Sequence, residues 1–232
     1  MPLDNAAVLA EIAALHKKKP FYKHAVWQGL YDGSYSRAQV KMLIRQNSII
    51  PLHNHNFHGR LYVICPDPQW RAMIAEVVYE EGTGRLYANG KPHSALYLQL
   101  GRALGIRDKE MWNTPYCAGA LAFREYFGQV CGRNFLEGVS AHMLAGETPV
   151  PTDGASRYRA LRDHYGLDDH ALEFFIVHQT ADEDHSGVGV TLLEQFARTE
   201  EERRRVIATV DETLDMFLFM FDDFHRVVKA VR

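Results

Sequence analysis

The segment from residue 206 to 224 constrains the fold most strongly, because its apolar residues recur at intervals of three and four. The residues of this stripe are Val206, Ile207, Val210, Leu214, Phe217, Leu218, Phe221 and Phe224. Such spacing places them along one face of an α-helix that is about five turns long. A stripe of this length has to pack against other apolar faces, so we interpret it as a long core helix.

Nearly every other long segment also has a helical period, and signals for helix starts are frequent. These signals are Asp4 before 6–16, Asp67 before Pro68, and the capping-box pairs Ser36 with Gln39 and Thr199 with Glu202. In the stretch from Ala38 to Cys65, Pro51 must kink the helix or split it into two. The sequence therefore predicts an all-α protein.

The length and composition suit one compact helical domain. The chain has 232 residues, of which 47% are apolar, enough to bury a sizeable core. We expect residues 1–232 to form a single domain, a bundle of about seven to eight helices.

The charge and the apolar pattern exclude several kinds of partner. A net charge of −3 and a charged fraction of 24% argue against nucleic-acid binding. No apolar run approaches the roughly 18 residues of a membrane span, and the start of the chain lacks a secretory pattern. Three scattered cysteines suit reduced, mostly buried thiols. We expect a cytoplasmic protein whose partner is a small molecule.

A metal-binding pattern follows the apolar run 171–177. His178, Asp182 and His185 are spaced by four and then three residues, which places them within roughly 60° of arc on one α-helix. Imidazole and carboxylate groups are ligands for iron, manganese or zinc. The alternative is a solvated polar face, although a helix that enters a core carries polar groups that need partners.

Other residues could complete such a site, but none is persuasive alone. Glu80 and Glu81 end an apolar helix, His93 opens the next one, and Glu147 closes a third. Each could equally be a surface residue at a helix end. A further cluster holds His53, His55 and His58 near Pro51; these side chains could line a substrate pocket, supply an extra ligand or lie on the surface.

Taken in order, these residues resemble the haem-oxygenase-like diiron oxidase and oxygenase family, part of the helical superfamily that also holds TenA-like proteins. The resemblance rests on Glu80-Glu-Gly-Thr-Gly84, His93, Glu147 and His178-x3-Asp182-x2-His185, and it extends over most of the chain. It implies a haem-oxygenase-like fold of seven or eight helices. It also implies two Fe(II) ions, with manganese as the alternative metal, and O2 as co-substrate. The implied ligands, which would also be the catalytic residues, are Glu80, His93, Glu147, His178, Asp182 and His185. Glu81 remains an alternative to Glu80.

Flanking stretches such as 30–40 look closest to pyrroloquinoline-quinone synthase, a relative that oxidises its substrate without metal. That relative carries arginines and other non-ligands in the penultimate helix, where this chain has His178, Asp182 and His185. The difference favours the metal-dependent branch. A metal-free oxidase and a thiaminase-like small-molecule binder remain the alternatives, although no cysteine has a recognisable catalytic context.

The resemblance also indicates the type of reaction. It implies N-oxygenation, oxidative carbon–carbon cleavage or desaturation of a small amino- or carboxylate-bearing metabolite in natural-product or cofactor biosynthesis, and it leaves room for an external electron donor and a homodimer. We place Tyr22 and His55 in the substrate pocket. One subgroup makes 4-aminobenzoate from its own tyrosine with the help of a lysine after the second glutamate. No lysine lies between Glu147 and His178, which argues against that route here.

Overall fold

The computed structural model describes residues 3–147, 150–181 and 188–231, and these residues form helices and connecting turns without a β-strand. The all-α prediction is confirmed. The elements in chain order are α1 (Asn5–Lys18), the 3-10 helix η1 (Phe21–Lys23), α2 (Ala25–Tyr31), α3 (Arg37–Asn47), α4 (Asn54–Ile64), α5 (Pro68–Thr83), α6 (His93–Ala103), α7 (Asp108–Trp112), α8 (Ala118–Arg133), α9 (Phe135–Val139), the π-helix η2 (Ser140–Glu147), α10 (Val150–Tyr165), α11 (Glu173–Ala181), α12 (Val188–Phe196) and α13 (Glu200–Lys229).

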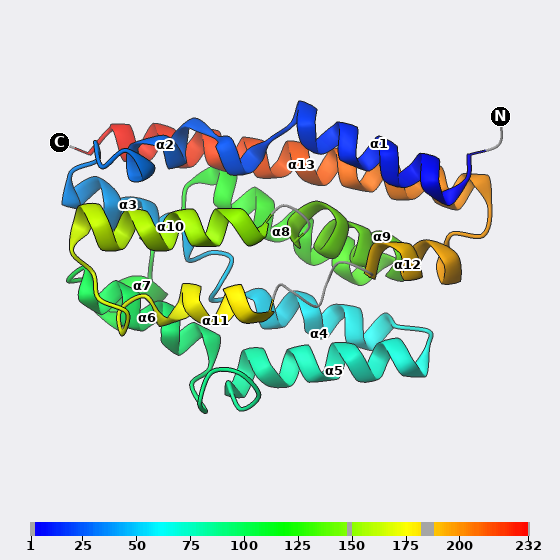
Figure 1. Cartoon of the computed structure of the whole chain (residues 1–232), viewed down its shortest axis with the longest axis horizontal. Coiled ribbons are helices and arrows are strands. Elements are labelled where there is room, and N and C mark those ends of the chain that lie inside the picture. Colours follow the sequence, from blue (N-terminus) through cyan, green and yellow to red (C-terminus); the bar gives the residue numbers. More distant parts are fainter. Residues whose placement is uncertain (1–2, 148–149, 182–187, 232) are drawn as a thin grey trace.

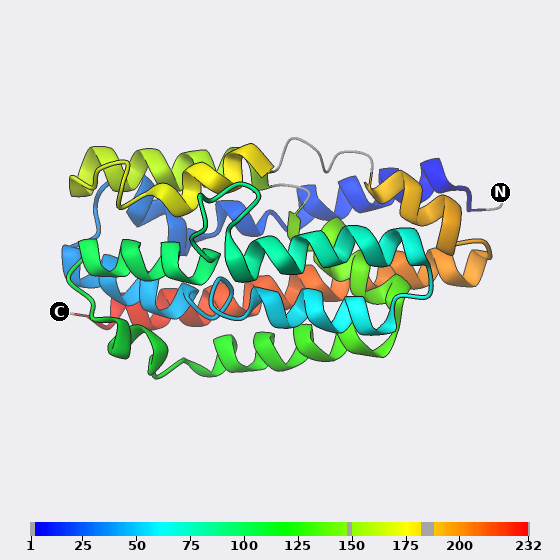
Figure 2. The same ribbon diagram turned by 90° about the horizontal axis from the view of Figure 1, so that it is seen from below.

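The long helix α13 organises the bundle. It runs along most of the long axis, with α1 and α2 beside it in the same layer, and the two ends of the chain lie at opposite ends of that axis (Figure 1). Its apolar stripe is buried as predicted; Leu214 and Phe224 are fully inaccessible to solvent. On its other side α13 packs against α8 and η2, and α8 in turn packs against α4. Helix α5 lies beyond α4 and away from α13 in Figure 1, and the view from below in Figure 2 shows α4 and α5 running side by side, in agreement with their contact.

The predicted helix starts are confirmed by side-chain hydrogen bonds to free backbone N–H groups. The capping residues are Asp4 before α1, Ser36 with Gln39 at α3, Asp67 before α5, and Thr199 with Glu202 at α13. The predicted break at Pro51 is confirmed as well, because α3 ends at Asn47 and α4 begins at Asn54. Caps of this kind stabilise a helix by about 1 kcal/mol each.

Helix α8 is capped from another helix rather than from its own sequence. Its N-cap residue Cys117 makes no side-chain capping bond. Instead Asp223 of α13 accepts a hydrogen bond from the backbone N–H of Gly119 at 2.8 Å. This contact between helices fixes the start of α8 against α13, and α4 packs on the helix so placed.

Two further expectations, on the cysteines and on membrane-spanning helices, can be compared with the described residues. Cys65, Cys117 and Cys131 are free and buried, as predicted. No helix in residues 3–147, 150–181 or 188–231 is long and apolar enough to cross a membrane.

Candidate metal centre

Three predicted ligands or their neighbours meet where α5, α6 and α11 approach one another. Glu81, His93 and His178 each offer one ligand atom, and these atoms lie within 4.8 Å of one another. Glu81 and His93 are buried, whereas His178 is partly buried. The His93 and His178 rings lie with their centroids 4.8 Å apart. We call Glu81, His93 and His178 the first ligand group.

Glycine at position 84 lets α5 and α6 meet. Gly84 has φ +62°, and a Cβ atom at this position would lie only 1.9 Å from the carbonyl oxygen of Lys91. The carbonyl of Gly84 accepts hydrogen bonds from the N–H groups of Ala88 and Gly90. The chain therefore folds back tightly over 84–92 and returns His93 to the end of α5.

Glu80 holds this turn rather than joining the first ligand group. Its two carboxylate oxygens accept hydrogen bonds from the backbone N–H groups of Leu86 at 2.6 Å and Tyr87 at 3.2 Å. One of these oxygens also lies 3.3 Å from Nε2 of His93. The sequence analysis placed Glu80 first among the ligands and left Glu81 as the alternative; the structure groups Glu81 with His93 and His178.

The turn is also tied to α11. The ammonium group of Lys91 lies 2.5 Å from Oε2 of Glu173, at the start of α11. Beneath the turn, Ala88 packs with Leu96 and Val177 in a small apolar cluster. These contacts bring the helix that carries His178 to the start of α6.

Electrostatics in the first group favour a charged carboxylate among imidazoles. Burial raises the pKa of Glu81, but its contact with His93 outweighs burial and brings that pKa down to about 2. Burial also opposes the charged form of His93, yet the carboxylates of Glu81 and Glu80 raise the pKa of its ring. Burial lowers the pKa of His178. The charge of His58 contributes to the shift at Glu81, so the His58 ring lies within electrostatic reach of this group.

A second ligand group is formed by His58 of α4 with His142 and Glu147 of η2. Their ligand atoms also lie within 4.8 Å of one another. In an α-helix, residues five apart would point about 140° away from each other. Because η2 is a π-helix, in which each backbone hydrogen bond spans five residues, His142 and Glu147 lie on the same side. Nδ1 of His142 is 3.5 Å from Oε1 of Glu147.

Asn54 joins the two groups. Its amide nitrogen donates to Oε1 of Glu81 at 2.8 Å, and its amide oxygen lies 3.3 Å from Nε2 of His142. This orientation assigns the Nε2 proton to His142, which leaves Nδ1 facing Glu147. A single side chain at the start of α4 therefore contacts one member of each ligand group.

The donor set fits a pair of ions. Nδ1 of His93 is buried and makes no hydrogen bond within the described ranges; it lies 3.4 Å from Oε2 of Glu81, so the two atoms face the same point. In His178, Nδ1–H donates to the carbonyl of Phe174 at 2.7 Å, which leaves Nε2 free to bind. Among the described residues, the side chains that would hold an ion in one group or the other are Glu81, His93, His178, His58, His142 and Glu147. Asp182 and His185, the other two predicted ligands, lie outside the described residues.

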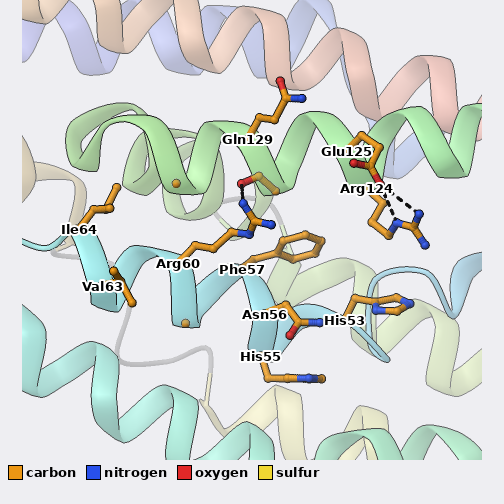
Figure 3. Close-up of a pocket in the computed structure, with 13 residues that line it drawn as sticks. His53, His55, Asn56, Phe57, Arg60, Val63, Ile64, Arg124, Glu125 and Gln129 are labelled. Carbon is orange, nitrogen blue, oxygen red and sulfur yellow. Dashed lines mark hydrogen bonds and ion pairs between the residues drawn. The ribbon is translucent and has the colours of Figure 1, made fainter.

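The two predicted pocket residues lie elsewhere. Tyr22 lies in η1, where its ring meets Phe21 edge on. His55 is exposed at the start of α4 and lines an open cleft of about 710 Å³ between α4 and α8 (Figure 3). Arg60 and Arg124 line the same cleft. Among its lining residues, all within the described ranges, none belongs to either ligand group, so the pocket roles of Tyr22 and His55 stay predictions.

Sequence reasoning did not assign His142 or Asn54 to the site, and it left the role of His58 open. The signal for His58 was its place in the histidine cluster near Pro51. His142 gave no signal, because a spacing of five residues from Glu147 matches neither a helix nor a strand period.

A sequence model of iron-containing redox enzymes matches residues 41–217, a range that includes both ligand groups and Asn54. The chain belongs to this family of iron-containing redox enzymes. Membership makes iron the expected metal and redox chemistry the expected reaction class. It is in agreement with the resemblance drawn from the motifs.

Similar proteins cover nearly the whole chain. A 4-aminobenzoate synthase from Nitrosomonas europaea is 31% identical over 227 residues, which span 93% of this chain and 90% of the relative. Among solved structures, a TenA homologue from Pseudomonas syringae has a TM-score of 0.73 at 8% identity and covers 97% of both chains. A domain of unknown function with a haem-oxygenase-like fold from Shewanella denitrificans has a TM-score of 0.72 at 15% identity and covers 96% of this chain and 90% of its own. The haem-oxygenase-like fold predicted from the sequence is therefore confirmed.

Proposed function

We propose that the protein is a non-haem diiron oxidase or oxygenase that uses O2 to oxidise a small amino- or carboxylate-bearing metabolite. The observation that carries the proposal is the pair of ligand groups joined by Asn54 in a member of an iron-containing redox family. When bound, two ferrous ions would supply the electrons that reduce oxygen. The proposal includes an external electron donor for the centre. It also places the reaction in natural-product or cofactor biosynthesis.

The residues of the chain would hold and orient this centre. The backbone carbonyl of Phe174 fixes the tautomer of His178, and Asn54 restrains the carboxylate of Glu81. Carboxylates can change between terminal and bridging binding during a reaction, while imidazoles hold fixed positions. Phe127, whose ring centroid lies 5.6 Å from that of His142, helps to exclude water from the second group.

Arg157, which is linked to the first group only through aromatic neighbours, is our candidate for binding a substrate carboxylate. The guanidinium group of Arg157 lies 3.8 Å from the ring centroid of Trp27, and its charge reaches Tyr97. The Tyr97 ring packs against Phe174, and Phe174 packs against His178. A carboxylate bound at Arg157 would therefore lie on the same side of the bundle as the first group.

The related 4-aminobenzoate synthase suggests an aromatic amine as product. We propose that the substrate is a free small molecule and not a side chain of the protein, because no lysine lies between Glu147 and His178. The intact mass of the chain after turnover tests this point. An unchanged mass supports an external substrate, and loss of a tyrosine side chain would contradict it.

Iron binding and oxygen consumption test the proposal as a whole. Protein loaded anaerobically with ferrous iron should bind two ions per chain and consume O2 on mixing. His93→Ala and His178→Ala should lower the rate by roughly 100-fold or more, because each removes a ligand. The matched control is His164→Ala, which changes an exposed histidine at the end of α10 and should leave the rate unchanged. A wild-type protein that oxidises substrate without taking up iron would be a metal-free oxidase and would overturn the proposal.

A further inference from the structure

We propose that the cleft between α4 and α8 is a separate ligand site, which binds a small organic anion: a carboxylate or phosphate group joined to an apolar body. The cleft has a volume of about 710 Å³, within the range of small-molecule sites in proteins. Its lining residues, all within the described ranges, include no member of either ligand group. The proposal therefore goes beyond the proposed function and does not depend on a metal.

Helix α4 separates this cleft from the candidate metal centre. Asn56, Arg60 and Val63 recur at intervals of four and three, so they share one side of the helix, and all three are exposed. His58 and Leu61 lie on the opposite side and are buried. A ligand in the cleft would therefore contact α4 on its solvent side, away from His58.

The two ends of the cleft differ in polarity. His53 and Arg124 lie at one end, whereas Val63 and Ile64 lie at the other, with Arg60 between them (Figure 3). Val63 is 77% exposed, so the apolar end presents uncovered aliphatic surface. A ligand with its anionic group beside Arg124 and its apolar body beside Val63 matches this arrangement.

The charge of the lining favours an anion. The lining holds two guanidinium groups, those of Arg60 and Arg124, and one carboxylate, that of Glu125, although the whole chain has a net charge of −3. Burial lowers the pKa of His53, and the charges of Arg124 and His55 lower it further. The polar end of the cleft therefore has a positive potential, and a cleft concentrates such a field on the ligand.

The guanidinium group of Arg60 is held in place against α8. Its Nη1 donates to the carbonyl of Gly128 at 3.1 Å, the one hydrogen bond that this group makes within the described residues. A Cβ atom at Gly132 would lie 3.4 Å from Nη1, so the group lies close to the backbone of α8. Its other N–H groups are left for an anion, and a planar group fixed in this way loses little freedom on binding.

Arg124 is paired only weakly. Its Nη2 and Nε both donate to Oε1 of Glu125, at 3.0 and 3.3 Å, and its Nη1 donates to no residue in the described part of the chain. The two side chains are 35% and 67% exposed, and an ion pair so exposed contributes little to stability. A ligand anion therefore joins or displaces Glu125 at little cost, and the planar fork of Arg124 suits carboxylate and phosphate oxygens alike.

A photoreactive anion tests the proposal. The probe 4-benzoylbenzoate joins a carboxylate to two aromatic rings and inserts into nearby C–H bonds under ultraviolet light. Calorimetric titration of the wild-type protein should give saturable binding with a dissociation constant below about 1 mM. Peptide mass spectrometry after irradiation should find the label within 53–64 or 124–132. Labelling only elsewhere, or no saturable binding in this range, would overturn the proposal.

A glycine variant blocks the cleft with little risk of misfolding. Gly59 lines the cleft, and a Cβ atom added there meets nothing within 4 Å. Gly59→Leu should fill the cleft, introduce a better helix former and weaken probe binding by about 10-fold or more. The matched control is Gly82→Leu, because a Cβ atom at this position in α5 also meets nothing but lies outside the cleft. It should bind the probe as the wild type does. Unchanged affinity in Gly59→Leu would show that the probe binds elsewhere and that the proposal is wrong.

Arginine variants test the contacts with the anion. Arg60→Gln and Arg124→Gln each keep a polar side chain but remove the charge, and each should weaken binding by about 10-fold. Arg133→Gln, at the end of α8 and outside the lining, changes the net charge equally and should leave the affinity unchanged. An equal loss in all three variants would reduce the effect to overall charge and overturn the proposal.

Two related probes identify the chemistry of the ligand. Neutral benzophenone should bind about 10-fold more weakly than 4-benzoylbenzoate, and equal binding would overturn the role of the anion. The phosphate analogue 4-benzoylphenyl phosphate should also bind and lose affinity in Gly59→Leu. Tighter binding of the phosphate or of the carboxylate supports the site in either case and identifies the anionic group of its ligand.

Discussion

Replacement of Gly84 by alanine should both destabilise the protein and weaken metal binding. The added Cβ atom would lie 1.9 Å from the carbonyl oxygen of Lys91 and 2.4 Å from its carbonyl carbon. Contacts shorter than 3.0 Å do not occur for real Cβ atoms, so the turn over 84–92 must move by at least about 1 Å. Because both neighbours are backbone atoms, no side-chain rotation relieves the clash.

The magnitude follows from two costs. A non-glycine residue with positive φ costs about 1–2 kcal/mol, and overpacking in a closely packed region costs about 1–3 kcal/mol more. The free energy of unfolding should therefore fall by about 2–5 kcal/mol in Gly84→Ala. Since His93 follows this turn directly, its displacement should weaken Co(II) binding by roughly 10- to 100-fold.

Alanine variants of two neighbouring glycines distinguish the cost of positive φ from the cost of overpacking in the same assays. Gly90 also has positive φ, 79°, but a Cβ atom there meets nothing within 4 Å, so Gly90→Ala should cost only about 1–2 kcal/mol. Gly82 lies in α5 with neither strain nor a close neighbour, so Gly82→Ala should be neutral or stabilise by up to about 1 kcal/mol. Urea unfolding and cobalt titration measure both quantities. The reasoning is refuted if Gly84→Ala matches Gly90→Ala in stability and in cobalt affinity.

Three other predictions test single contacts. Asp223→Ala should lower the free energy of unfolding by about 1 kcal/mol through loss of the α8 cap. Burial opposes the charged form of Asp223, but the hydrogen bond from the Gly119 N–H lowers the pKa of this carboxyl below the ordinary 3.8. The stabilisation by the cap is therefore present at neutral pH and is lost when Asp223 becomes protonated. The urea midpoints of Asp223→Ala and wild type should converge as the pH falls below 3.8. Thr199→Ala should cost about 1 kcal/mol at the start of α13 in urea unfolding and leave cobalt affinity unchanged. Asn54→Leu should weaken cobalt binding by roughly 10- to 100-fold, and an unchanged titration would contradict its role between the two groups.

Local signals in the sequence were sufficient for much of the fold. The helix caps at Asp4, Ser36, Asp67 and Thr199 depend on residues within one turn of each other, and all were predicted correctly. The apolar stripe of α13 was equally clear, because burial of one helix face imposes a period that any chain must follow. The cap on α8 could not be predicted, since Asp223 lies 104 residues from Gly119.

The residues of the candidate metal centre also fall into those that the sequence indicated and those that only the folded structure revealed. The sequence alone offered the types of ligand, and the family resemblance predicted His93, Glu147 and His178 among the ligands. That assignment stays a prediction, although the structure brings His93 and His178 into one group. Tertiary structure gives Glu80 and Glu81 different surroundings: the Glu80 carboxylate accepts from the backbone of the turn over 84–92, and Glu81 is the one grouped with His93 and His178. It also brought His58 of α4 to His142 of η2, 84 positions further along the chain. Contacts across such separations depend on how helices pack, and packing is set by the whole core rather than by any one segment.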